Sequence, residues 1–301
     1  INTLSGAVTV DGSTAVLDMN GRTDTVSSVI LANNATIQSS TPGGVLTSTG
    51  GFDVRSGLIS AAIAGNGLTK STSGTVSLTA ANSYTGTTSV SAGTLVLSGN
   101  GAVSSSTLID VAAGATFDVA GVTGGYVLAS GQTLKGNGTI RGSATIEGTL
   151  APGASPGLLT FENALVLGAT SETFMEIVGT SRGVAGGYDA VDVGTSLSYG
   201  GDLILTMTSG ISLGTYDLFD FTSQSGDFAT VSFAGGFYAG TFTNNGSGLW
   251  SATDTNGSGQ TFQFSQATGD LSVVPEPATA VLAGFGLAGV LVWTRRSRRR
   301  G

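Results

Sequence analysis

The sequence predicts an all-β protein with a β-solenoid (β-helix-like) body, an aromatic-rich antiparallel β cap and a single C-terminal transmembrane helix. Three observations predict this fold. First, the 301 residues include 49 Gly and 79 Ser plus Thr but only 10% charged residues, a composition that disfavours long helices. Second, apolar stretches of strand length recur between turn residues throughout the body. Third, an uncharged apolar run near the C-terminus is followed by a cluster of arginines.

The first region, residues 1–183, is a succession of short apolar segments separated by Gly, Asn, Ser or Pro. Several segments alternate apolar with small polar residues, and the turns come too often for helical crossovers. A sandwich of longer strands is the alternative. Strands of three to five residues, few aromatic residues and many Gly and Asn for tight corners favour the solenoid. Examples of these segments are Ala15–Leu17, Val29–Leu31, Val76–Leu78, Leu95–Leu97, Thr116–Val119, Thr145–Ile146 and Leu165–Leu167.

Residues 57–98 contain the clearest repeat pattern. From Gly74 to Leu97 the chain shows a strand, an Asn82-Ser83-Tyr84-Thr85-Gly86 turn, a second strand, a turn at Gly93 and a third strand. This stretch resembles the autotransporter-associated β-strand repeat, although Thr87 stands where that family more often has a second Gly. The resemblance implies a β-helical stalk displayed at the cell surface. It does not imply autotransport, because the chain ends in a different kind of segment.

The second region, residues 184–270, contains eight of the 13 Phe, four of the six Tyr, and Trp250. Its strands are longer, and Asn245-Gly246 and Asn256-Gly257 are strong hairpin signals. We therefore expect an antiparallel sheet that covers the open end of the solenoid. The expected strands are Asp202–Thr208, Tyr216–Thr222, Phe237–Thr243, Leu249–Thr253 and Gln260–Ser265.

The third region, residues 271–301, has three parts in a fixed order. Val274-Pro275-Glu276-Pro277 predicts an exposed, extended segment, because proline cannot lie in a central strand or a helix interior. The uncharged run Ala278–Trp293 would span about 24 Å as a helix, somewhat less than the roughly 30 Å of a bilayer core. The basic cluster that follows predicts a cytoplasmic C-terminus, with everything before Val274 across the membrane. This cluster consists of Arg295, Arg296, Arg298, Arg299 and Arg300.

This tail resembles the PEP-CTERM sorting signal of exported proteins in Gram-negative bacteria. The resemblance implies a transient inner-membrane anchor, processing near Pro-Glu-Pro by an exosortase-type membrane protease, and delivery to the envelope, cell surface or exterior. Pro275, Glu276 and Pro277 would then be a recognition element without a catalytic role. The alternative is a permanent C-terminal anchor. The chain starts at Ile1 without a basic, apolar leader, so we expect a fragment or a chain lacking its processed signal.

Composition restricts the possible chemistry. The chain has no His and no Cys, which removes Ser-His and Cys-His catalysis, disulfides and thiolate or imidazole metal ligands. Residues 1–273 have a net charge of −12 and the remaining residues +4, so the acidic body argues against nucleic-acid binding. The run Gly284–Gly289 matches GxGxxG but lies within the apolar segment, so we expect a helix face of small residues instead of a nucleotide site. No cofactor is expected.

The carboxylates suggest no local acid–base pair. Glu172 and Glu176 would lie about 13 Å apart along a strand, which is too far for a glycosidase pair. Asp189/Asp192 and Asp217/Asp220 would point to opposite faces of their strands, while pairs across rungs remain open. Asp254–Gly259 lacks the full ligand series of a calcium loop, so we expect a hairpin turn and no metal site. Threonine pairs such as Thr47/Thr49 show no common period that would indicate ice binding.

Three functional hypotheses follow from these observations. The first is a non-enzymatic structural or adhesin-like surface protein of an exopolysaccharide-rich envelope. The second is a carbohydrate-binding module, with exposed aromatic rings stacking on sugars; the alternative for these rings is burial in the core. The third is a β-helical polysaccharide lyase or hydrolase, which the scarcity of basic partners disfavours. The aromatic candidates are Tyr216, Phe237, Tyr238 and Trp250.

Overall fold

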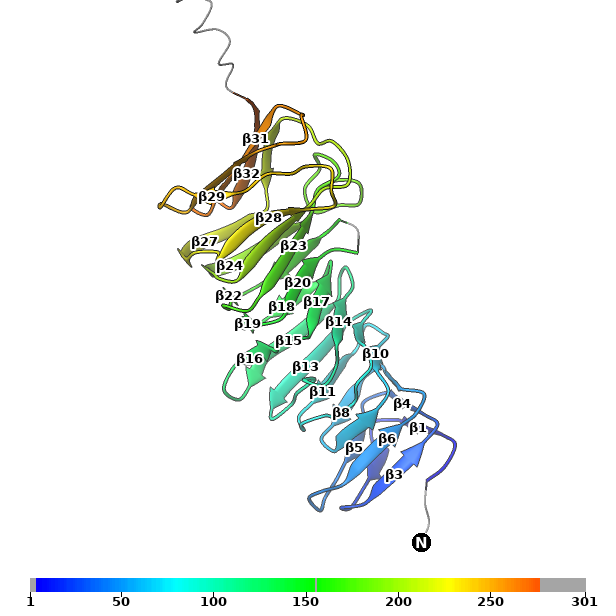
Figure 1. The fold of residues 1–301 in the computed structure, drawn as a ribbon. Coiled ribbons are helices and arrows are strands. Elements are labelled where there is room, and N and C mark those ends of the chain that lie inside the picture. Colours follow the sequence, from blue (N-terminus) through cyan, green and yellow to red (C-terminus); the bar gives the residue numbers. More distant parts are fainter. Residues whose placement is uncertain (1–3, 155, 277–301) are drawn as a thin grey trace, which may run out of the picture.

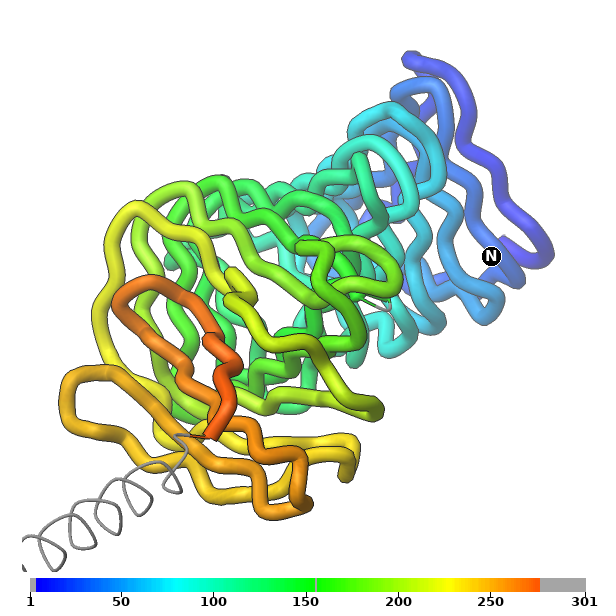
Figure 2. The backbone as a smooth tube through the Cα atoms, turned by 90° about the horizontal axis from the view of Figure 1, so that it is seen from above, coloured from blue at the N-terminus to red at the C-terminus, as the bar shows by residue number. Residues whose placement is uncertain are grey.

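A computed structural model describes residues 4–154 and 156–276, and all of its regular elements are β-strands. The chain coils along one long axis, and each turn of the coil lies against the one before it (Figures 1 and 2). The strands form an 11-stranded, a 13-stranded, a 3-stranded and a 5-stranded sheet. The first three sheets are parallel and the last is antiparallel, so the predicted all-β solenoid architecture is confirmed.

The 11-stranded sheet runs the full length of the solenoid. Its neighbours pair with offsets that vary from one turn to the next: Phe52 pairs with Leu68, 16 residues later, whereas Glu172 pairs with Asp202, 30 residues later. In order along the sheet its strands are β1 (Ala7–Asp11), β4 (Ser28–Ala32), β7 (Phe52–Val54), β10 (Leu68–Lys70), β12 (Thr88–Val90), β14 (Leu108–Val111), β17 (Thr133–Gly136), β20 (Thr149–Pro152), β23 (Glu172–Glu176), β25 (Asp202–Thr206) and β28 (Thr230–Ala234).

The 13-stranded sheet covers a second face and, through one long strand, part of a third. β24 (Ala190–Tyr199) pairs with β21 through its first half and with β22 through its second half. The other strands are β2 (Val16–Asp18), β5 (Ala35–Gln38), β8 (Gly57–Ile59), β11 (Thr75–Leu78), β13 (Thr94–Gly99), β15 (Thr116–Val122), β16 (Tyr126–Leu128), β18 (Thr139–Arg141), β19 (Ala144–Ile146), β21 (Leu158–Phe161), β22 (Leu165–Leu167) and β27 (Phe219–Gly226). The 3-stranded sheet consists of β3 (Thr23–Val26), β6 (Val45–Ser48) and β9 (Ala62–Gly65).

The core forms because inward residues of one turn pair with inward residues of the next. Ile37, Ile59, Leu78 and Leu97 form one such column, and all four are fully buried. Burial of each side chain of this size contributes about 1.5–3 kcal/mol. Because every turn repeats the arrangement, the alternating pattern of the sequence becomes a continuous apolar core.

The corners of the coil are tight and need glycine at specific positions. Gly93, between β12 and β13, has a φ of +67°, and a Cβ at this position would lie 2.3 Å from the carbonyl oxygen of Gly74. A side chain is therefore excluded both by the backbone conformation and by the close approach of the preceding turn. This explains why the short strands alternate with glycine-rich segments.

The antiparallel sheet lies at the C-terminal end of the solenoid (Figure 1). It seals the last turn with aromatic side chains: the Phe264 ring lies 5.9 Å from that of Phe228 and 6.1 Å from that of Phe219. Its strands are β26 (Gly214–Asp217), β29 (Thr243–Asn244), β30 (Leu249–Thr253), β31 (Gln260–Ser265) and β32 (Asp270–Pro275).

The parallel solenoid extends beyond residue 184, where the sequence predicted the antiparallel region to begin. Asp202–Thr208 was expected in the antiparallel sheet, but β25 pairs in parallel with β23 and β28, and parallel pairing extends to Ala234. Tyr216–Thr222 was expected as one strand but is divided between antiparallel β26 and parallel β27. The prediction was wrong here because alternation identifies a half-buried strand but not the direction of its neighbour. Leu249–Thr253 and Gln260–Ser265 are antiparallel strands, as predicted.

The predicted membrane helix, Ala278–Trp293, lies outside the described residues, as do Pro277 and the five C-terminal arginines. Within residues 4–154 and 156–276, no helix has the length and apolar character needed to cross a membrane.

Candidate functional site

The segment predicted to carry the sorting signal begins inside the last strand of the cap. Val274 pairs with Thr261 and Pro275 with Gln260 in the β31–β32 ladder, and the Glu276 N–H donates to the carbonyl oxygen of Gly259 at 2.7 Å. Val274, Pro275 and Glu276 are all exposed. The folded body therefore presents the start of this segment as an extended strand at its surface.

A proline is tolerated in this strand because one side of β32 is open where the proline lies. β26 pairs with β32 only as far as Gly214 opposite Val273, so Pro275 faces no second strand that would require its N–H. Leu271 and Val273, just before it, are buried in the cap. The strand is thus anchored by its first half and exposed along its second.

The predicted repeat forms one complete turn of the solenoid and the start of the next. β10 and β12 lie in the 11-stranded sheet, β11 and β13 in the 13-stranded sheet, and the loop between β11 and β12 covers the third face. Asn82 in this loop is buried; its Oδ1 accepts from the Ile63 N–H and its Nδ2 donates to the Ala102 carbonyl, both at 3.1 Å. One amide therefore joins the preceding and the following turns.

Lys70 in β10 fixes the next corner. Its side chain is fully buried, and its Nζ donates to the carbonyl oxygens of Thr72 and, at 3.0 Å, Ala92. Burial lowers the pKa of this amine, while the nearby Asp53 carboxylate acts in the opposite direction. This lysine lies within the repeat segment 57–98, and it satisfies carbonyl groups at two successive corners.

Comparison with known families matches two segments of the chain. The model of the passenger-associated-transport-repeat matches residues 68–97, and that of the PEP-CTERM protein-sorting motif matches residues 273–299. Both predicted resemblances are confirmed. No curated protein matches the chain. The sorting motif marks an exported protein that is directed to an exosortase and to the cell surface or exterior, and the repeat indicates a β-helical passenger.

The aromatic residues suggested as sugar-stacking platforms are mostly buried. Tyr216, Tyr238 and Trp250 are at most 8% exposed, whereas Phe237 is 44% exposed. Their polar atoms are also used internally: the Tyr238 hydroxyl accepts from the Ile211 N–H at 2.8 Å, and the Trp250 Nε1–H donates to Gln266 at 2.7 Å. The stacking hypothesis was therefore wrong for these three rings, which form the core of the cap.

Carboxylates do approach one another across turns, which local sequence spacing does not reveal. Asp192 pairs in register with Asp220, and Glu172 pairs with Asp202. Arg182 partly neutralises this acidic region. It forms ion pairs with Asp192 at 2.7 Å and with the nearby Asp217 at 2.9 Å. Burial raises the pKa of Asp217, whereas Arg182 lowers it.

Asp189, considered above only as a possible partner of Asp192, is a buried carboxylate. Its two oxygens accept from the backbone N–H groups of Gly157 at 2.7 Å and Glu176 at 2.8 Å, so it joins a corner after β20 to the end of β23. Burial raises its pKa to about 7, although both backbone donors act in the opposite direction. The alternation of side chains along a strand predicted only that Asp189 and Asp192 point to opposite faces.

The acidic turn at Asp254 is a hairpin connection, as expected. Its Oδ1 accepts from the N–H groups of Ala239 and Asn256, both at 3.0 Å, and its Oδ2 from that of Ser258 at 2.9 Å. Burial tends to raise the pKa of Asp254, but these donors hold it at about 2. Among the residues that the structure describes, no group of three or more acidic side chains could hold a metal ion.

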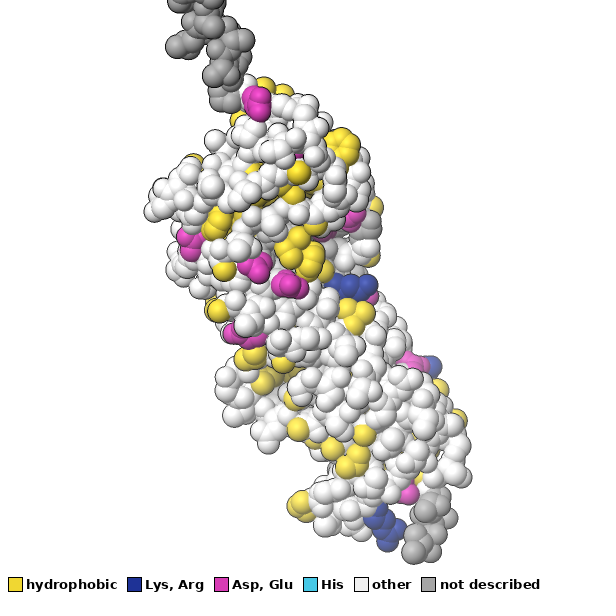
Figure 3. Space-filling view, viewed as in Figure 1, with side chains coloured by type: hydrophobic (Ala, Val, Ile, Leu, Met, Phe, Trp, Pro, Cys, Tyr) yellow, Lys and Arg dark blue, Asp and Glu magenta, His cyan; other side chains and the backbone are white. Residues whose placement is uncertain are grey.

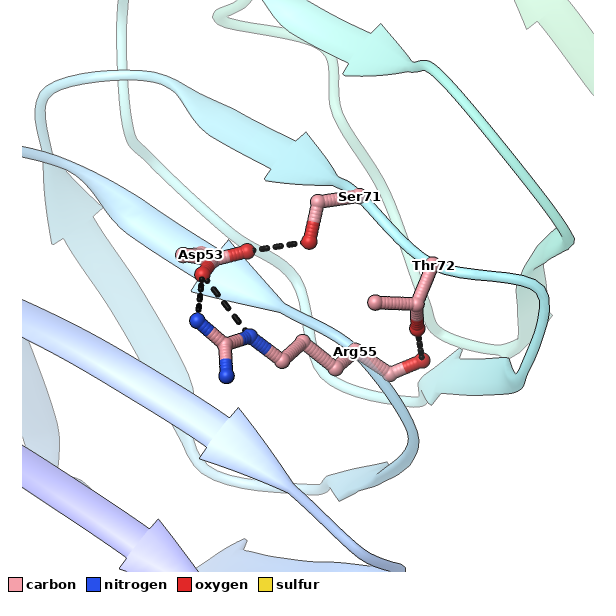
Figure 4. Close-up of polar contacts among 4 residues, drawn as sticks. All are labelled: Asp53, Arg55, Ser71 and Thr72. Atoms are coloured by element: carbon pink, nitrogen blue, oxygen red, sulfur yellow. Dashed lines mark hydrogen bonds and ion pairs between the residues drawn. The ribbon is translucent and has the colours of Figure 1, made fainter.

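Most basic side chains of the body are already paired. In the turn around β7, the Asp53 carboxylate accepts from the Arg55 guanidinium at 2.9 Å and from the Ser71 hydroxyl (Figure 4). Lys135, Arg141 and Arg182 also form ion pairs with carboxylates. The face of the molecule in Figure 3 shows few charged side chains, and this face offers little attraction to an anionic polymer.

Proposed function

We propose that the chain is an exported surface protein that an exosortase-type protease processes near Pro275, and whose solenoid has a structural or adhesive role in an exopolysaccharide-rich envelope. The sorting motif at residues 273–299, beginning in an exposed edge segment of β32, is the observation that carries this proposal. In this proposal Val274, Pro275, Glu276 and Pro277 form the recognition segment. The apolar run Ala278–Trp293 holds the chain in the inner membrane until it is cleaved.

The arginines at the C-terminus keep the short tail in the cytoplasm and so place the solenoid on the other side of the membrane. They are Arg295, Arg296, Arg298, Arg299 and Arg300. After cleavage the product retains all 32 strands of the described residues, because the last of them ends at Pro275. The released protein therefore keeps every described turn of the solenoid and the cap.

A structural role is supported over a catalytic one by how the carboxylates are used. Asp189 holds two backbone segments together, Asp192 and Asp217 share Arg182, and Asp53 binds Arg55 and Ser71. These groups are tied to the fold, whereas a general acid or base must reach a substrate. Neither matched family model describes an enzyme.

The test is mass spectrometry of the C-terminus after cells are separated into inner membrane, outer envelope and medium. A C-terminus near Pro275 in envelope or medium is expected. An intact end at Gly301, confined to the inner membrane, would contradict the proposal. Glu276→Ala is expected to retain the unprocessed form at the membrane, whereas Glu172→Ala, an exposed glutamate outside the motif, is expected to be processed normally.

A further inference from the structure

Five threonines form a continuous column on the outer face of the 13-stranded sheet. They are direct partners across five successive strands, β11, β13, β15, β18 and β21, and none of them is buried. Parallel strands lie about 4.8 Å apart, so hydroxyl groups recur at that spacing along the solenoid axis. The column consists of Thr75, Thr94, Thr116, Thr139 and Thr160.

The hydroxyl groups of this column are not used by the fold. Outward threonines elsewhere donate within the protein: Thr230 to Asp202 at 2.7 Å and Thr170 to Glu147 at 2.8 Å. The five column hydroxyls make no such hydrogen bond to any residue in the described ranges. Each can therefore donate one hydrogen bond to a ligand and accept from it.

At its C-terminal end the column enters a groove of about 520 Å³. Thr139 and Thr160 line the groove together with Asn137, while Leu158 and Val184 supply apolar surface, and Val184 is 51% exposed. A concave surface with apolar walls and a few polar groups is the usual form of a small-molecule or glycan site. The groove thus combines apolar contact with hydroxyl groups aligned along one direction.

The loop that forms one wall of the groove is held in place. Arg182 precedes Gly183 and Val184 and is fixed by its ion pairs to Asp192 and Asp217. The Gly183 N–H donates to the Tyr188 carbonyl at 2.7 Å, and a Cβ at Gly183 would lie 2.7 Å from the Leu158 Cβ, so the loop packs directly on β21. The wall is preformed, which reduces the entropy lost on binding.

The chemistry of the groove indicates an uncharged ligand. The described residues of its lining include no charged side chain, and residues 1–273 around it have a net charge of −12. This net charge would repel an acidic polymer, and the nearby Arg141 and Arg182 are already paired with carboxylates. An added peptide strand has no open sheet edge here, because β18 is hydrogen-bonded to β15 and to β21.

We propose that this groove binds a neutral polysaccharide, with the sugar chain running along the solenoid axis over the threonine column. Thr139 and Thr160 exchange hydrogen bonds with sugar hydroxyls, and Leu158 and Val184 contact the apolar faces of the rings. Successive sugar residues advance by a distance similar to the spacing of the strands. The proposal supplies a ligand for the proposed surface protein, but binding is measured on the purified full chain and does not depend on processing.

The experiment uses the full chain in detergent micelles and a panel of labelled oligosaccharides. The neutral probes are glucan, mannan and galactan oligomers, and the acidic probe is an oligogalacturonate of the same length. We expect binding to at least one neutral probe and not to the acidic one. Thr139→Val/Thr160→Val, which removes two hydroxyls at constant shape, is expected to weaken binding about tenfold.

The matched control is Thr133→Val/Thr149→Val. These two threonines are also direct partners in neighbouring turns and equally outward, but they lie in the 11-stranded sheet and outside the groove. Their replacement is expected to leave binding unchanged. The proposal is overturned if no neutral probe binds, if the acidic probe binds more tightly, or if the two double variants lose affinity equally.

Discussion

Pro275 pairs with Gln260 in the β31–β32 ladder, so the folded body extends into the sorting motif itself. The strand that carries the motif's first residues is also the strand whose Leu271 and Val273 complete the core of the cap. Folding of the cap and presentation of the motif are therefore properties of one strand. A cleavage site only a few residues earlier would remove part of the sheet.

The position of the C-terminus is expected to determine stability. A chain ending at Glu276 should unfold at the same temperature as the full chain, because all cap strands are present. A chain ending at Gly269 lacks β32, exposes the partners of Leu271 and Val273, and loses about 1.5–3 kcal/mol for each of these side chains. Thermal unfolding followed by circular dichroism measures the difference. Equal unfolding temperatures would show that the cap does not depend on β32.

The only two lysines of the chain offer a matched comparison. Lys70→Met removes a buried donor and leaves the carbonyls of Thr72 and Ala92 without it, so we expect a loss of about 2–4 kcal/mol. Lys135→Met breaks a surface ion pair with Asp110 at 3.5 Å and should cost less than about 1 kcal/mol. Urea denaturation of both variants gives the two free energies. Similar losses of stability in the two variants would show that the hydrogen bonds of Lys70 to the two corners do not stabilise the fold.

Asp189 is expected to make stability depend on pH. Its pKa is about 7 in the folded protein and near 3.9 in an unfolded chain. Between these values the folded state holds a proton that the unfolded state releases, so raising the pH favours unfolding. The contribution is fully present below about pH 4 and is lost as the pH rises towards 7, with a slope of up to about 1.4 kcal/mol per unit.

Asp189→Asn removes this titration and leaves the other ionisable groups unchanged. The difference in urea midpoint between wild type and variant should therefore change between pH 5 and pH 7 and become constant above pH 8. A difference that stays the same from pH 5 to pH 8 would mean that Asp189 is charged throughout this range.

Two phenylalanines separate core packing from surface exposure in the cap. Phe264 is fully buried against Tyr199, Phe219 and Phe228, so Phe264→Ala should cost about 3–5 kcal/mol. Phe237 is 44% exposed, and Phe237→Ala should cost clearly less, because part of its ring is already in contact with water. Calorimetric unfolding provides the comparison. A larger loss for Phe237 than for Phe264 would show that Phe264 is not the ring that stabilises the cap.

The sequence was most informative where one signal repeats locally. The strands and corners between Leu68 and Leu97 follow from alternation and from glycine, because both patterns arise within a few residues. Asn82 was assigned to a turn, yet its side chain enters the interior to join two turns. Its partners Ile63 and Ala102 lie about 20 residues away, which no local pattern can reveal.

The threonine column of the candidate glycan site could not be predicted from the sequence either, because its members lie far apart along the chain. Thr75 and Thr94 are 19 residues apart, whereas Thr116 and Thr139 are 23 apart, so their alignment has no fixed period in the sequence. Corners of different length bring them into one line. Likewise, the alternation in Asp202–Thr206 identified a strand correctly but could not say that its neighbours run parallel to it.

The unequal turns have a mechanical consequence. In a parallel solenoid the hydrogen bonds between turns point along the long axis, so a pull along that axis loads one turn at a time. A folded turn adds about 4.8 Å to the length. Once it is pulled loose, the 16 residues from Phe52 to Leu68 can extend to about 55 Å, and the 30 from Glu172 to Asp202 to about 105 Å. We therefore expect the stalk to lengthen under tension in steps of unequal size, dissipating a load gradually while its remaining turns stay folded.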